Sequence, residues 1–92
     1  MKFNALVPEL SVSDINKSKN FYIDILGFHL EYERVADKFA FLSYGEAQIM
    51  IEEINGYWNT GKLQYPFGRG VNFQITTDDV YKIVNTISYM SF

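Results

Sequence analysis

The sequence contains no cysteine, so disulfide bonds and thiolate metal sites are excluded. It has a single histidine and a net charge of −3 without any basic tract, which argues against a nucleic-acid partner. It also has no apolar run long enough to span a bilayer, and its N-terminus lacks a signal-peptide pattern. We therefore expect no membrane partner and a cytoplasmic location.

Aromatic residues, by contrast, are abundant in this short chain. Of its 92 residues, 48% are hydrophobic and 17% are aromatic, with eight Phe, seven Tyr and one Trp. A chain of this length supports one small domain with a modest core. Since such a core cannot easily enclose every ring, we expect some aromatic side chains to line a pocket or an interface.

Alternation of apolar and polar residues predicts four strands in the first half of the chain, over residues 3–12, 28–35, 39–44 and 47–54. Short turns join the last three strands, which predicts an antiparallel meander. Pro8 offers no N–H to a ladder, so the first strand should lie at a sheet edge or pair irregularly.

A helix is predicted between the first two strands. Ser13 or Asp14 would cap its N-terminus, and an apolar stripe begins at Ile15. Gly27 would end the helix in the left-handed conformation that glycine adopts readily.

The remainder of the chain resembles a partial repeat of this plan. Residues 71–77 predict a strand and a second helix follows; with Asp14 placed over Asp79, Val7 falls on Asn72. The fold class is therefore α+β. Residues 1–92 form a single domain made of a βαβββ module (1–54), a linker loop (55–70) and an incomplete β-α second module (71–92).

Three short segments stand out: Val-Pro-Glu-Leu-Ser-Val-Ser-Asp at 7–14, Asn-Phe-Tyr at 20–22 and Leu-Gly-Phe at 26–28. Together they resemble the opening of the vicinal oxygen chelate superfamily, which includes glyoxalase I, extradiol dioxygenases, and fosfomycin- and bleomycin-resistance proteins. Residues 37–40 and 49–51 are most similar to bleomycin-resistance proteins. The resemblance implies paired modules whose sheets curl into cups, and for the bleomycin-resistance group a homodimer that sequesters the drug without chemistry.

Enzymes of this superfamily use a divalent metal held by His and Glu side chains on the cup face, so the resemblance raises the question of a metal site. Matched by position, the ligand slots here carry Val7, Glu52 and Asn72. Valine cannot ligate and asparagine is a poor neutral ligand, so we predict no metal, no cofactor and no catalytic residue. His29 is not at a ligand slot, and alternation alone does not assign it to the cup face or to the helix face.

The cup face instead suits a small cationic or aromatic ligand, because it combines aromatic walls with carboxylates. If Glu9 faces the cup, alternation places both aromatic and polar side chains of the neighbouring strands on the same face. The loop residue Trp58 is added as part of the rim of the pocket. The predicted ligand-binding residues are Glu9, Phe39, Phe41, Met50, Glu52, Trp58, Asn72 and Gln74. The alternative is an ordinary half-exposed sheet face of mixed polarity.

Three functions are compatible with these residues. The first is a non-catalytic protein that binds a bleomycin-type antibiotic as a dimer and confers antibiotic resistance by sequestration. The second is a metal-dependent relative of the glyoxalases and dioxygenases. The third is a truncated remnant without retained activity. A general acid–base pair of Glu9 and Glu52 is less favoured, because the sequence shows neither a tuned pKa nor a positioned substrate.

Overall fold

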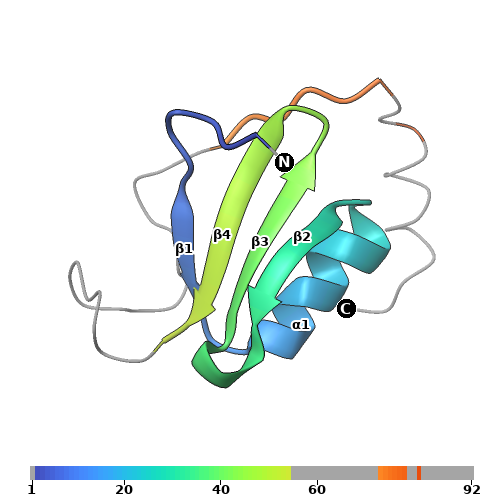
Figure 1. Ribbon diagram of the computed structural model, residues 1–92. Helices are drawn as coiled ribbons and strands as arrows, with labels where there is room; N and C mark the ends of the chain where they lie inside the picture. The colour runs from blue at the N-terminus through green and yellow to red at the C-terminus, as the bar shows by residue number, and fades with distance from the viewer. Residues whose placement is uncertain (1, 55–72, 79–80, 82–92) are drawn as a thin grey trace.

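The computed structural model describes residues 2–54, 73–78 and 81, which form a four-stranded mixed sheet with a helix packed on one face (Figure 1). The strand order is β1-β4-β3-β2, with β1 parallel to β4 and the other pairs antiparallel. The predicted meander and the edge position of the first strand are therefore confirmed within this part of the chain. The elements are β1 (Glu9–Val12), α1 (Ile15–Asn20), η1 (Phe21–Ile25), β2 (His29–Arg34), η2 (Val35–Asp37), β3 (Phe39–Tyr44) and β4 (Ala47–Glu53).

Strand β1 is shorter than the alternation of residues 3–12 predicts, since its ladder begins only at Glu9. The physical reason is Pro8, whose ring nitrogen carries no hydrogen. Its carbonyl still accepts a hydrogen bond from the Met50 amide at 2.8 Å, which joins the segment to β4. Residues 2–7 therefore lie outside the hydrogen-bonded ladder of β1.

The helix begins where the sequence predicts. The Asp14 carboxylate accepts hydrogen bonds from the backbone N–H groups of Asn16 and Lys17, at 3.0 and 3.1 Å. After α1 the helix widens into the π-helical segment η1, and it ends before Gly27, whose φ of +84° confirms the predicted left-handed position. No helix among the described residues is long enough and apolar enough to cross a membrane.

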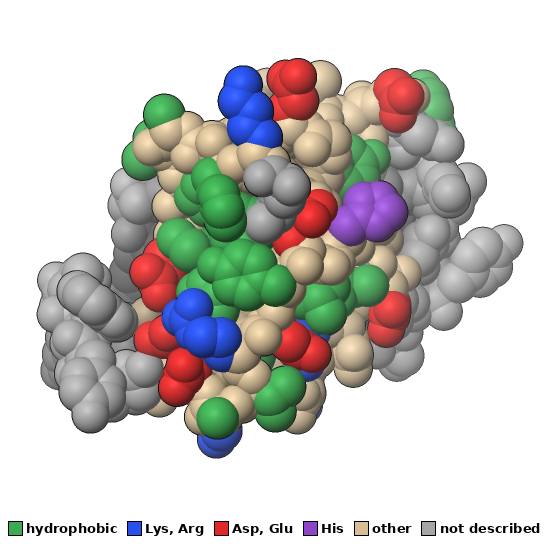
Figure 2. All heavy atoms as spheres, viewed as in Figure 1, with side chains coloured by type: hydrophobic (Ala, Val, Ile, Leu, Met, Phe, Trp, Pro, Cys, Tyr) green, Lys and Arg blue, Asp and Glu red, His purple; other side chains and the backbone are tan. Residues whose placement is uncertain are grey.

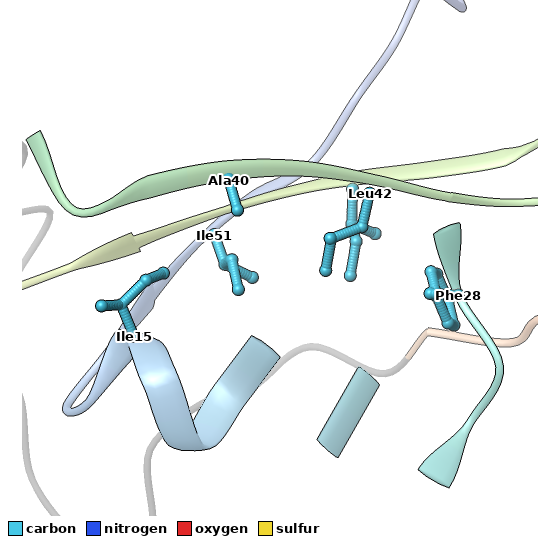
Figure 3. Packing of buried hydrophobic residues seen from close by; sticks show 6 residues of the cluster. Ile15, Phe28, Ala40, Leu42 and Ile51 are labelled. Carbon is cyan, nitrogen blue, oxygen red and sulfur yellow. The ribbon is translucent and has the colours of Figure 1, made fainter. Parts of the chain in front are cut away.

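The core lies between the helix and the sheet (Figure 3). Its sheet side consists of alternate residues of β3 and β4, of which Leu42 and Ile51 are the most deeply buried large side chains. Since successive side chains of a strand point to opposite faces, Phe39 and Phe41 face away from the helix. The predicted parity of both strands is confirmed. The core cluster is Ile15, Phe28, Ala40, Leu42, Ile49 and Ile51.

The second module remains a prediction. Residues 73–78 form neither a strand nor a helix, so the strand predicted over 71–77 is not formed at 73–77. A strand exists only where its backbone pairs with another strand. This segment instead meets the sheet through a side chain, with the hydroxyls of Thr77 and Tyr44 at 2.5 Å. Residues 71–72, 79–80 and 82–92, and the predicted linker at 55–70, lie outside the described residues.

Removal of the helix cap should weaken the fold measurably. Asp14→Ala deprives two backbone N–H groups of their acceptor, which should cost about 1 kcal/mol of the free energy of unfolding. Asp14→Asn keeps a side-chain oxygen at the same place and should retain most of that stability. Urea unfolding followed by circular dichroism measures both variants. Equal stability of the wild-type protein and Asp14→Ala would contradict the cap's contribution.

Candidate functional site

The sheet face opposite α1, here called the open face, carries its side chains in cross-strand rows. The pairing of β1 with β4, β4 with β3 and β3 with β2 fixes these rows. Figure 2 views this face and shows hydrophobic side chains gathered near its centre, with acidic and basic side chains around them. The middle row is Glu9, Met50, Phe41 and Tyr32; the neighbouring rows are Ser11, Glu52, Phe39 and Arg34, and Gln48, Ser43 and His29.

A group of rings on this face, here called the aromatic platform, consists of Phe3, Tyr32, Phe39 and Phe41. The rings of Tyr32 and Phe41 stack with 5.4 Å between centroids and 7° between planes, and Tyr32 lies 5.9 Å from Phe39. Phe3 meets Phe41 edge-on at 5.1 Å. Such distances and orientations are those that aromatic pairs prefer, so the platform is a packed unit rather than a chance exposure.

A β-bulge brings Tyr32 to this face. Leu30 pairs with Leu42 on the helix side, but the register then shifts, so that Tyr32 rather than Glu31 pairs with Phe41. Without the extra residue, strict alternation would turn Tyr32 toward the helix. Sequence alternation alone therefore does not reveal Tyr32 as a site residue, and no glycine in this strand signals the bulge.

Charged groups frame the platform on both sides. The Arg34 guanidinium carbon lies 4.0 Å from the Phe39 ring centroid, and its Nε donates to Asp37 Oδ2 at 3.1 Å. The hydroxyl of Ser43, a residue only 7% exposed, donates to Glu31 Oε1 at 2.6 Å and fixes that carboxylate beside the rings. The platform therefore already holds one cation against an aromatic face, and carboxylates stand within the same rows.

The structure brings together most of the residues predicted to bind a ligand. Glu9, Phe41 and Met50 share one row, and Phe39 and Glu52 occupy the next. Gln74 is exposed and lies in the separate 73–78 segment. Trp58 and Asn72 are outside the described residues. The role of this set in binding stays a prediction, to which the structure adds Phe3, Tyr32 and Arg34 as neighbours.

The described residues do not supply the donor set of a divalent metal site. Val7 is half-buried and has no ligating atom, and Asn72 is not described. Within the ranges 2–54 and 73–78, no three His, Cys, Asp or Glu side chains converge in a way that could hold an ion. His29 pairs with Ser43 and so lies in a row of the open face, which settles its parity.

Two hollows lie off the open face, around the helix. One of about 180 Å³ is lined by Leu26, Phe28, Tyr44, Ile75 and Thr77. The other, of about 340 Å³, contains two ion pairs, Lys19 with Glu33 at 2.8 Å and Lys38 with Glu53 at 3.4 Å. In both, polar groups are paired within the chain or scarce, so neither offers the unpaired chemistry of a reaction centre.

One partly buried phenol beside the helix, that of Tyr22, has a shifted pKa. Burial raises the pKa of the Tyr22 phenol above its ordinary value of 10.0, because the charged phenolate is poorly solvated there. Its ring packs against Phe28 at 5.4 Å. Tyr22 is therefore a neutral packing residue at physiological pH.

Comparison with known proteins gives three relevant similarities. The sequence profile of the Glyoxalase/Bleomycin resistance protein/Dioxygenase superfamily matches residues 2–90. A Synechocystis sp. protein named "Probable lactoylglutathione lyase" is 32% identical over 84 residues, which cover 85% of this chain and 63% of that protein. A glyoxalase/bleomycin resistance protein/dioxygenase superfamily member from Vibrio splendidus has a TM-score of 0.52 at 36% identity, covering 89% of this chain and 64% of that structure.

A more distant structure agrees in fold alone. The fosfomycin resistance protein FosX from Listeria monocytogenes superimposes with a TM-score of 0.63 at 24% identity, over 96% of this chain and 66% of that one. The present chain thus spans about two thirds of the length of the relatives it matches.

Proposed function

The chain belongs to the glyoxalase/bleomycin resistance protein/dioxygenase superfamily, and from this premise we propose that it binds a small molecule on the open face without transforming it. The ligand is flat and aromatic or cationic, and bleomycin-type antibiotics are its best representatives. The protein acts by sequestration, as a homodimer.

The aromatic platform is the observation that carries this proposal. The ring of Tyr32 stacks on the buried ring of Phe41 and stays more than a third exposed, so it offers a flat surface on which a planar ligand can stack. The Glu31 carboxylate, held by Ser43, and the Glu9 carboxylate, which follows Met50 in the middle row, supply negative charge to the same face. This combination favours ligands with planar rings and positive charge, as in bleomycin-type drugs.

We propose binding without catalysis because of the side chains that the open face offers as metal ligands or nucleophiles. Val7 occupies a slot where the superfamily's enzymes carry a metal ligand, and a valine side chain cannot coordinate. The Ser43 hydroxyl donates to the Glu31 carboxylate, and Ser43 is only 7% exposed, so this hydroxyl is poorly placed to reach a substrate. Binding therefore accounts for these residues more simply than turnover does.

The proposed dimer supplies the second wall of the binding site. A single open face is a shallow surface, whereas ligand sites usually bury most of the ligand. Every residue of the edge strand β2 is exposed, so β2 is open to a partner beside the platform. A partner that contacts β2 and turns its own open face toward the first copy would enclose a crevice between the two aromatic platforms.

One comparison favours a second candidate, a metal-dependent lyase. The Synechocystis relative carries the name "Probable lactoylglutathione lyase" at 32% identity. This candidate requires metal ligands from residues outside those described, together with Glu52, which lies on the open face. It is the less favoured proposal because Val7, which cannot coordinate a metal, occupies one of the metal-ligand positions.

Calorimetric titration with bleomycin tests the binding proposal. We expect stoichiometric binding that does not change after treatment with a chelator. Glu9→Gln should weaken binding about two- to fivefold, because it removes one partly screened charge from the site. Asp24→Asn removes the same charge from η1 on the other side of the sheet and is the matched control. If neither the wild-type protein nor Asp24→Asn releases heat with bleomycin, bleomycin-type binding is refuted. If both variants weaken binding equally, the role of Glu9 is refuted.

A turnover assay with methylglyoxal and glutathione, followed as the formation of S-lactoylglutathione, tests the lyase. We expect no activity above background when Ni²⁺, Zn²⁺ or Mn²⁺ is added, and less than one equivalent of metal in protein purified without a chelator. Metal-dependent turnover that Glu52→Gln abolishes would replace the binding proposal by the lyase.

A further inference from the structure

The open face is already occupied by a segment of the chain itself. Released from the ladder at Pro8, residues 2–7 run from β1 across the top of β4 toward β3 (Figure 1). Phe3 comes to lie on the aromatic platform, 5.1 Å from Phe41 at 82° and 6.5 Å from Tyr32 at 76°. The segment thus places one aromatic side chain on the rings that the proposed ligand would contact.

A single side chain, Gln48, holds the backbone on both sides of Phe3. Its Nε2 donates to the Lys2 carbonyl at 2.6 Å, and its Oε1 accepts from the Asn4 backbone N–H at 2.7 Å. A side-chain amide has one donor side and one acceptor side, as a peptide group does. Gln48 therefore pairs with the main chain flanking Phe3 much as a neighbouring strand would.

A third hydrogen bond completes the attachment, from Asn4 Nδ2 to the Glu46 carbonyl at 2.6 Å. The attachment remains superficial, however, because Phe3 is still 55% exposed and Lys2 and Asn4 are exposed as well. Each hydrogen bond of this kind contributes only modestly to the net free energy, because water can replace it, so the segment can leave the face at moderate cost. A ligand with the same groups can therefore displace the segment.

From these contacts we propose that the open face recognises an aromatic group flanked by two peptide amides, and that residues 2–4 are its intramolecular competitor. This inference rests on the proposed function, since it concerns the same face, and it narrows the ligand to aromatic peptides and peptide-like molecules. Gln48 provides the two-point contact to the amides, and the aromatic platform receives the ring. A ligand binds only to molecules whose segment has left, so the segment lowers its apparent affinity.

The test compares two capped peptides on the full-length protein. Acetyl-Lys-Phe-Asn-amide copies the bound segment, and acetyl-Lys-Ala-Asn-amide lacks the ring. Phe3→Ala empties the platform, so it should bind the Phe peptide about tenfold more tightly than the wild-type protein does. Gln48→Ala, added to Phe3→Ala, should weaken that binding at least about fivefold by removing both amide contacts. Amide chemical shifts in a titration report the affinities.

A second variant guards against misfolding of the first. Asn4→Pro keeps every ring but removes the N–H that Gln48 accepts, so it should also raise the affinity for the Phe peptide. Equal affinity of the wild-type protein and both variants, or equal binding of the Phe and Ala peptides, would overturn the inference.

Bleomycin titration of the same variants separates this inference from the proposed function. If the Phe peptide binds as expected and bleomycin does not, the inference stands and the drug assignment fails. If bleomycin binds the wild-type protein and Phe3→Ala equally and the peptide binds neither, the inference fails and the sequestration proposal stands.

Discussion

The central strand β3 imposes the constraint on which the rest of the structure depends, since its residues 39–43 are buried on both faces. Ala40 and Leu42 are covered by the helix, whereas Phe39 and Phe41, 3% and 1% exposed, need cover on the opposite side. A helix can cover only one face of a sheet. The open face must therefore provide its own apolar cover, and Tyr32 and Phe3 supply it. The same need for cover makes the face a good site for an aromatic ligand.

The sequence predicts the elements that obey regular periodicity and misses those that break it. The bounds of β3 and the orientation of Leu42 toward the helix follow from alternation alone, whereas capping preference narrows the helix cap to Ser13 or Asp14, of which the structure uses Asp14. The bulge before Tyr32 depends on packing against β3, which no local pattern reveals. Tyr32 and Phe3 are accordingly absent from the predicted site, because one is displaced by the bulge and the other by the ladder's late start at Glu9.

Membership of the superfamily defines the fold but leaves the chemistry to particular residues. The profile matches residues 2–90, yet the relatives with solved structures include proteins of different names and only modest identity. The described part of the open face has rings, an amide and carboxylates where a metal centre would need several convergent ligands. The recognition of planar, amide-bearing molecules that we propose uses Gln48 and the aromatic platform as two parts of this one surface.

Binding on the open face is most directly tested by a map of backbone amide shifts in the ¹H–¹⁵N spectrum during titration with bleomycin. If the ligand lies on this face, the largest shifts will occur in the middle row, at Glu9, Phe41 and Met50, and in the segment that carries Phe3. Shifts centred instead on Leu26, around the hollow beside the helix, would contradict binding on the open face.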